Sequence, residues 1–152
     1  MPDQVQHDRP PELEVHDVGA ALDAVCDAVE EAAEDEAVRD AAAALAIRHT
    51  EDAAAIAAMT DRLLTRVEGL AVGVERIPVC RRGASGVGAL ATWERLKAQG
   101  PAPDPLGNWS YMRGLAHAAR GMVHSLREHR AAEQPKVFIG RPGLPPLTPT
   151  AP

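Results

Sequence analysis

The side chains that could do chemistry are scattered along this 152-residue chain. A metal site needs His, Cys, Asp or Glu side chains that converge on one ion. His117 and His124 are seven residues apart, which is about 10 Å along a helix, too far for the pair alone to chelate an ion. Cys26 and Cys80 have no potential ligand partner near them in the sequence. The sequence therefore predicts no metal site and no cofactor.

Nucleophilic catalysis finds equally little support. Ser85 lies in Gly83-Ala84-Ser85-Gly86, which is half of a nucleophile elbow, but that turn needs a preceding apolar strand and none is present. The glycines up to Gly88 also lack the strand and loop that would let backbone amides hold a phosphate. Arg81 and Arg82 instead indicate a flexible, basic helix start. We predict no catalytic residues, and the pattern favours a protein that is not an enzyme.

One regular array of cationic and titratable side chains remains, and we call it the basic flank. It consists of Arg113, His117, Arg120, His124 and Arg127, at spacings of four and three. Such a row can contact phosphates at intervals, and the two histidines gain charge below about pH 6.5. However, the chain has a net charge of -6, only two lysines and no interleaved aromatic residues. A small nucleic-acid-associated regulator is thus an alternative hypothesis, and we prefer pairing of the flank with an acidic helix face.

The basic flank belongs to a helix predicted from Asn108 to Arg130, around which the fold is organised. Its apolar face repeats at spacings of three and four and comprises Met112, Ala116, Ala119, Val123 and Leu126, widened by Leu115 and Met122. Asn108 or Ser110 is expected to cap the first turn, and Arg127 and Arg130 lie where the helix dipole favours cations. The helix therefore has one face turned to a core.

The first predicted helix carries a narrow, coiled-coil-like seam. Four aliphatic residues, Val18, Leu22, Val25 and Val29, follow strict four-three spacing, and Asp17 is placed to cap the helix. The outer face is acidic, with Asp23, Asp27, Glu30, Glu31 and Glu34. Near Glu34 the apolar phase slips, which predicts either a bend or a continuous helix with a stutter. Residues 37–48 are rich in Ala, so we expect them to be helical but weakly anchored.

Two further helices are predicted before the organising one. The first runs from about Glu51 to Glu75, behind a Thr50 cap, and the residue before Pro78 ends it. The second runs from about Val79 to Gln99 and is followed by a break rich in proline. Trp93, with Trp109 and Tyr111 just beyond the break, could line a small-molecule site between helices. A ligand-binding helper is therefore a further alternative.

Composition favours an all-α protein of four or five helices. Two Trp, one Tyr and one Phe are too few for a core built on rings, and a chain rich in Ala suits closely packed helices. We expect a flexible lead-in over residues 1–16, an acidic helical arm over 17–49, a core domain over 50–130 and a Pro-rich disordered tail over 131–152. The tail includes Arg141 to Leu147, which resembles a polyproline II ligand. No signal peptide or membrane span is predicted, and two isolated cysteines indicate a reducing cytoplasm.

Residues 61–129 resemble, in the order of their elements, an uncharacterised actinobacterial family of small helical proteins labelled as natural-product biosynthesis proteins. The resemblance lies in Asp61 to Glu68, Gly86 to Leu96, the Gly100-Pro101 break, and Tyr111 to Ala116. It implies a small helical protein encoded near biosynthetic or regulatory genes, with no catalytic residues to carry over.

These patterns together favour a non-enzymatic, cytoplasmic interaction protein. Residues 1–70 contain seventeen acidic and five basic side chains, whereas residues 71–152 contain five acidic and eleven basic ones. Such halves can attract each other within one fold or between two copies. We therefore expect a protein partner or a homodimer through Val18, Leu22, Val25 and Val29.

Overall fold

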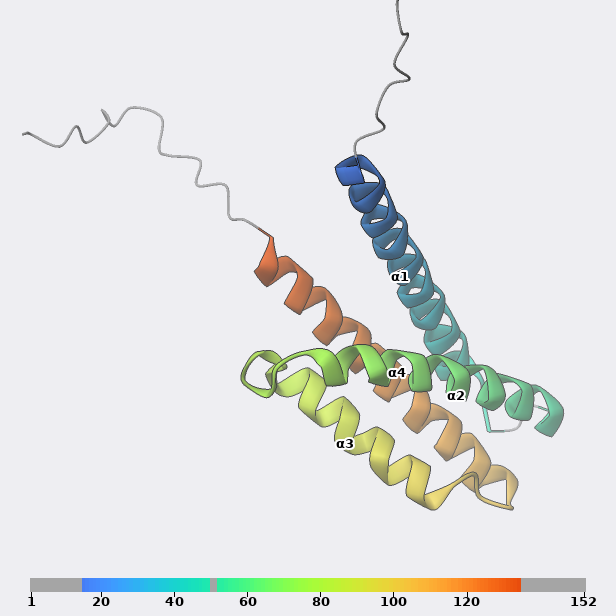
Figure 1. The fold of residues 1–152 in the computed structure, drawn as a ribbon. Helices are drawn as coiled ribbons and strands as arrows, with labels where there is room; N and C mark the ends of the chain where they lie inside the picture. Colours follow the sequence, from blue (N-terminus) through green and yellow to red (C-terminus); the bar gives the residue numbers. More distant parts are fainter. Residues whose placement is uncertain (1–14, 50–51, 135–152) are drawn as a thin grey trace, which may run out of the picture.

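The computed structural model describes residues 15–49 and 52–134, and within them the chain forms four α-helices and no strand (Figure 1). The helices are α1 (Val15–Ala46), α2 (Ala53–Arg76), α3 (Gly83–Gln99) and α4 (Pro105–Glu133), with a 3₁₀ turn η1 (Val79–Arg81) before α3. The predicted all-α bundle is confirmed. Residues 1–14 of the predicted lead-in, Thr50 and the proline-rich segment after Gln134 lie outside the described residues, whereas residues 15 and 16 belong to α1.

Helix α4 lies at the centre of the bundle and packs against α1, α2 and α3, whereas α2 and α3 touch each other only slightly. Its predicted apolar face is buried, including Met112, Leu115 and Met122. On α2 the matching face buries Ile56 and Leu63, again at helical spacing. Each outer helix therefore presents one apolar stripe to α4. Because all three pack on the same central helix, a small number of large apolar residues is enough to form the core.

The start of α4 differs from the sequence expectation. The α4 helix begins at Pro105, capped by Asp104, whose carboxylate accepts a hydrogen bond from the Gly107 amide at 2.8 Å. Proline fits the first helical position, because an amide N–H at that position would have no partner within the helix. The predicted cap, Asn108 or Ser110, is thus inside the helix. Helix α2 is capped by Asp52, which accepts from the Ala54 amide at 3.2 Å.

Helix α1 is continuous through Glu34, which answers the question of a bend. Its second half belongs to the core, since Ala37, Ala41 and Ala44 are fully buried. The expectation of weak anchoring is therefore wrong for this part, because small side chains let α1 approach its neighbours closely enough to be covered. The expected boundary between residues 49 and 50 does not separate α1 from the bundle.

The end of α1 is held by two side chains of α4. The indole N–H of Trp109 donates to the Ile47 carbonyl at 2.8 Å, and Arg113 donates to the Leu45 carbonyl at 2.8 Å. These carbonyls have no partners within α1, so the side chains satisfy groups that a helix end leaves free. The guanidinium of Arg113 also lies over the Trp109 ring, 4.9 Å from its centroid.

The predicted helix from Val79 to Gln99 is divided at Gly83. Residues 79–81 form η1, and Gly83 then takes φ +66° at the start of α3, a value that favours glycine. Arg82 closes the corner, because its guanidinium donates to the carbonyls of Glu75 and Ile77 at 2.9 and 3.0 Å. The turn thus ties the end of α2 to the start of α3.

Tyr111 is the single tyrosine of the chain, and its titration reports on the fold. Burial raises the pKa of its phenol above the ordinary value of 10.0, with a smaller contribution from the charge of Glu68. The unfolded chain therefore loses this proton first, so stability should fall as pH rises above 10. Tyrosinate absorbance should show a midpoint above that of the urea-unfolded chain. Coincident midpoints would contradict the prediction, and Tyr111→Phe should abolish the signal.

Candidate functional site

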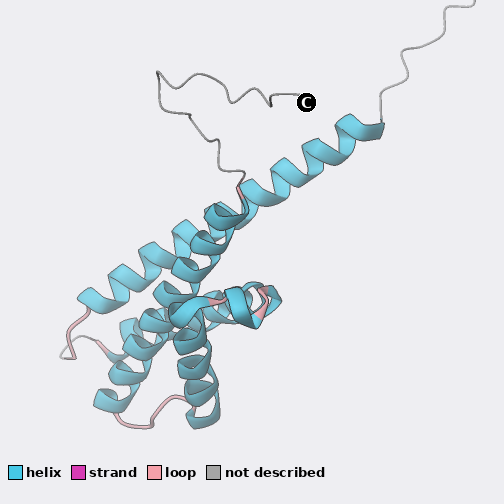
Figure 2. Cartoon of the chain, turned by 90° about the vertical axis from the view of Figure 1, so that its left-hand side faces the viewer, coloured by secondary structure: helices cyan, strands magenta, loops and turns pink. Residues whose placement is uncertain are grey.

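The first half of α1 is the part of the bundle that the rest of the fold leaves uncovered. Residues 18–33 are exposed, and this projecting half extends beyond the other helices in two views at right angles (Figures 1 and 2). The seam residues Val18, Leu22, Val25 and Val29 lie on it, with exposed fractions between 53% and 63%. The structure therefore places the four predicted seam residues together on one unpartnered face.

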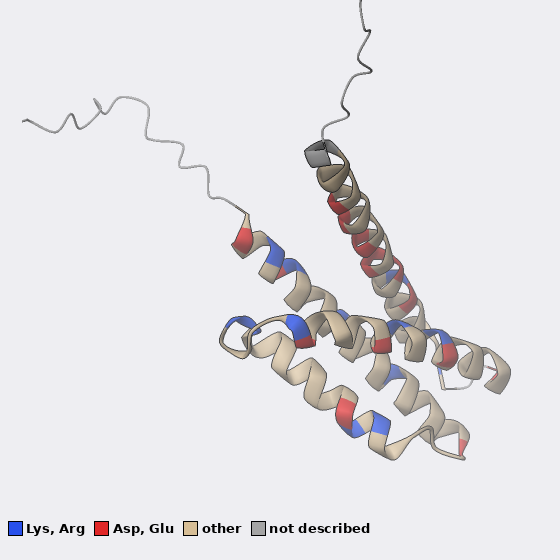
Figure 3. Ribbon diagram, viewed as in Figure 1, with Lys and Arg blue, Asp and Glu red and all other residues tan. Residues whose placement is uncertain are grey.

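The exposed apolar face is wider than four residues. In heptad positions, Leu22 and Val29 occupy a while Val18 and Val25 occupy d. The flanking e and g positions hold small residues, namely Gly19, Ala21, Cys26 and Ala28. A two-stranded coiled coil commonly carries charges at e and g, and this helix carries none there. The opposite side is acidic along its length (Figure 3).

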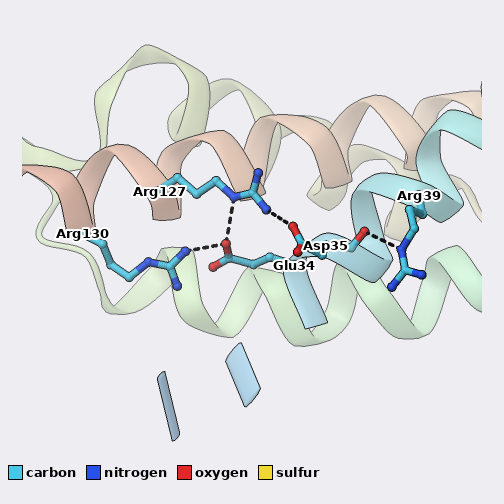
Figure 4. Close-up of polar contacts among 5 residues, drawn as sticks. All are labelled: Glu34, Asp35, Arg39, Arg127 and Arg130. Atoms are coloured by element: carbon cyan, nitrogen blue, oxygen red, sulfur yellow. Dashed lines mark hydrogen bonds and ion pairs between the residues drawn. The ribbon is translucent and has the colours of Figure 1, made fainter. Parts of the chain in front are cut away.

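A buried carboxylate holds α1 where the projecting half leaves the bundle (Figure 4). The side chain of Glu34 is only 4% exposed, and its carboxylate accepts from Arg127 Nε at 3.2 Å and Arg130 Nη2 at 2.5 Å. Arg127 also pairs with Asp35 at 2.7 Å. The hydrogen bond with Glu34 is the main cause that raises the pKa of Arg127. Both arginines come from α4, so this cluster joins the first helix to the last.

A second ion-pair cluster joins α1 to α2. Arg66 lies 2.5 Å from a Glu36 carboxylate oxygen and 3.3 Å from an Asp40 oxygen. Glu34 and Glu36 therefore point to different neighbouring helices. Because the two clusters hold α1 from two sides immediately after the projecting half, they fix the direction in which that half points.

A hollow of about 450 Å³ opens beside the base of the projecting half, and we call it the groove. It lies among α1, α2 and α4. Its apolar lining comprises Ala33, Gly69, Leu70, Val72, Gly73, Ile77 and Leu126. Charged and titratable side chains also line it, namely Glu30, Glu34, Arg66, Arg76, His129 and Arg130. The groove is thus a mainly apolar depression with more cationic than anionic groups around it.

The basic flank is divided among different contacts. Arg113 is used at the end of α1, and Arg127 pairs with Glu34 and Asp35. His124 lies 3.3 Å from a Glu128 oxygen on its own helix. His117 and Arg120 are exposed, and neither forms an ion pair with another described residue. Two of the three arginines are therefore already engaged within the chain, which does not favour a phosphate-binding row.

The three residues predicted to line a small-molecule pocket lie in different surroundings. Trp93 and Tyr111 are buried in the core, whereas Trp109 is half-buried at the end of α1, with its ring 5.8 Å from that of His49. None of the three lines the groove. A ligand site built from them stays a prediction.

Ser85 and the two cysteines are the remaining candidates for chemistry. The Ser85 hydroxyl donates to the Gly121 carbonyl at 3.2 Å, which joins α3 to α4. Cys26 and Cys80 are both exposed and free. Over residues 15–49 and 52–134, no group of three His, Cys, Asp or Glu side chains could hold a metal ion. No helix in that part of the chain is both long enough and apolar enough to cross a bilayer.

Sequence reasoning did not identify Arg66 and Arg130 as ion-pair partners of α1, nor the α2 wall of the groove. A signal for the groove exists in the sequence, because Gly69 and Gly73 are four residues apart on α2 and Val72 lies beside them, outside the predicted core face.

Comparison of the chain with protein-family models, curated proteins and solved structures finds no match.

Proposed function

We propose that this protein is a non-enzymatic interaction protein that self-associates through the projecting half of α1. One observation carries the proposal, namely four aliphatic side chains exposed in a row on the half of α1 over which residues 18–33 are all exposed. Most helices in proteins are stabilised mainly by packing of an apolar face against another element. A second copy would supply that packing.

The size of the seam bears on how such a pair would form. Burial of one large aliphatic side chain contributes about 1.5 kcal/mol or more, so the eight seam residues of two copies contribute about 12 kcal/mol. Association costs about 4–15 kcal/mol in lost translational and rotational freedom. The free energy gained by burial of the seam alone is therefore similar to the cost of association, and a stable dimer needs further contact area.

The cellular setting is part of the same proposal. The resemblance of residues 61–129 to a family labelled as natural-product biosynthesis proteins supports an accessory role beside biosynthetic or regulatory genes. Two exposed, free cysteines suit a reducing cytoplasm, because exposed thiols oxidise elsewhere. Binding of nucleic acid and binding of a small molecule have no comparable support, since two arginines of the basic flank are engaged and none of the three aromatic residues lines the groove.

Leu22→Asp should convert a dimer to a monomer in light scattering at micromolar concentration. The substitution places a charge in the middle of the seam, where association would have to desolvate it. Ala20→Asp is the matched control, because residue 20 lies on the acidic side of the same exposed helix half. The control should remain dimeric. A wild-type chain that is monomeric, with a mass unchanged by Leu22→Asp, would refute the dimer.

A further inference from the structure

We propose that, in the dimer, the projecting half of α1 of each copy lies in the groove of the other copy. This inference rests on the proposed self-association and names its geometry. Each subunit has one projecting half and one groove, so two copies can exchange them about a two-fold axis. The helix of a copy cannot fill its own groove, because Ala33 and Glu34 of that helix already form part of its wall.

The width of the apolar face supports insertion between two helices over pairing with one. Small or aliphatic residues occupy a, d, e and g over residues 18–29, so more than one side of the helix needs cover. A groove with walls from α2 and α4 offers two surfaces at once. The groove also adds the contact area that the seam alone lacks.

The α2 wall of the groove suits close contact with a helix. At Gly69 nothing lies within 4 Å of the position where a Cβ would stand, whereas at Gly73 that position is 3.2 Å from Leu126 Cδ2. Val72, beside them, is half exposed. A backbone can approach closely where glycine lacks a Cβ, so this wall can receive the row formed by Leu22, Val25 and Val29.

The charges of the projecting half and of the groove are complementary. The side of α1 opposite the seam carries Asp23, Asp27 and Glu31, and it has no arginine or lysine between residues 18 and 33. Arg76 lines the groove and forms no ion pair with another described residue, whereas His129, also in the lining, lies 3.5 Å from a Glu133 oxygen of its own helix. When the seam faces the groove, these carboxylates lie on its open side, and the negative charge of the helix as a whole is attracted to a groove with more cationic than anionic side chains.

The first test fills the groove. Gly69→Leu should raise the dissociation constant of the dimer at least tenfold in sedimentation velocity, because its side chain would occupy the space meant for the partner helix. Gly88→Leu, at an exposed position of α3, is the matched control, since Gly88 also has nothing within 4 Å of a Cβ and the residue change inside a helix is the same. Equal affinity of both variants and wild type would overturn the inference.

The second test locates the contact by photo-crosslinking of the full chain. Unlabelled Cys80→Ser chains carry a benzophenone on Cys26, and isotopically labelled Cys26→Ser, Cys80→Ser chains are mixed with them. After irradiation and trypsin digestion, we expect crosslinks to the labelled peptide Val67–Arg76, which forms the α2 wall of the groove. Crosslinks confined to labelled α1 would overturn the exchange and leave the dimer standing. If the mixed chains and the wild type both remain monomeric, both proposals are refuted.

Discussion

Replacement of Glu34 by Gln should lower the free energy of unfolding by about 2–3 kcal/mol, because it removes the only acid buried in the interface between α1 and α4 among the described residues. Its carboxylate accepts from Arg127 and Arg130, and Gln keeps the volume while losing the charge. The cost lies at the low end for a broken buried pair, because both guanidinium groups are partly exposed and water can solvate them. Urea unfolding followed by circular dichroism measures the change.

Asp35→Asn is the control for this prediction. Asp35 pairs with the same Arg127, at 2.7 Å, but its side chain is 62% exposed. Exposed ion pairs contribute about 0–1 kcal/mol, so this variant should unfold within about 1 kcal/mol of wild type. Equal losses in the two variants would show that burial of Glu34 is not what makes its ion pairs important.

Gly86→Ala should destabilise the protein by about 2 kcal/mol, although alanine is the better helix former. A Cβ at this position would lie 2.9 Å from Arg82 Cγ and closer still to the Ser125 hydroxyl. That hydroxyl is not free to move, since it donates to the Arg82 carbonyl at 2.8 Å. The new methyl group must therefore separate α3 from α4 or break this hydrogen bond. The shift of the urea midpoint reports the loss.

Gly88→Ala provides the opposite result in the same helix. Nothing lies within 4 Å of the position of its Cβ, so the substitution adds helix propensity without a clash. We expect a gain of up to about 1 kcal/mol. If both alanines stabilise the protein, the packing of α3 on α4 tolerates an added methyl group and our account of Gly86 is wrong.

The sequence predicts the parts of this fold in which periodicity and burial agree. The apolar stripe from Met112 to Leu126 predicts the core face of α4, and Val18 to Val29 predicts an apolar row that the structure leaves exposed. Helix ends are less accessible. Asp104, Asn108 and Ser110 are all possible caps for α4, and only the observed hydrogen bond with Gly107 distinguishes Asp104 from the others.

The second half of α1 shows why burial is harder to predict from composition. An alanine-rich stretch buries little area in each residue, which led to the expectation of weak anchoring. Ala37, Ala41 and Ala44 are nevertheless fully covered, because α2 and α4 meet on that side. Similarly, Glu34 belongs to an acidic run in which no residue is distinguished by sequence. Its burial depends on the position of α4, more than ninety residues away.

The central position of α4 has a consequence for the order of events during synthesis. Helices α1, α2 and α3 each make their largest set of contacts with α4, which follows all of them in the chain. The earlier helices therefore leave the ribosome before the element that covers their apolar faces exists. Stable folding should wait until residues near Met122 have emerged, and until then these helices depend on chaperones or on each other.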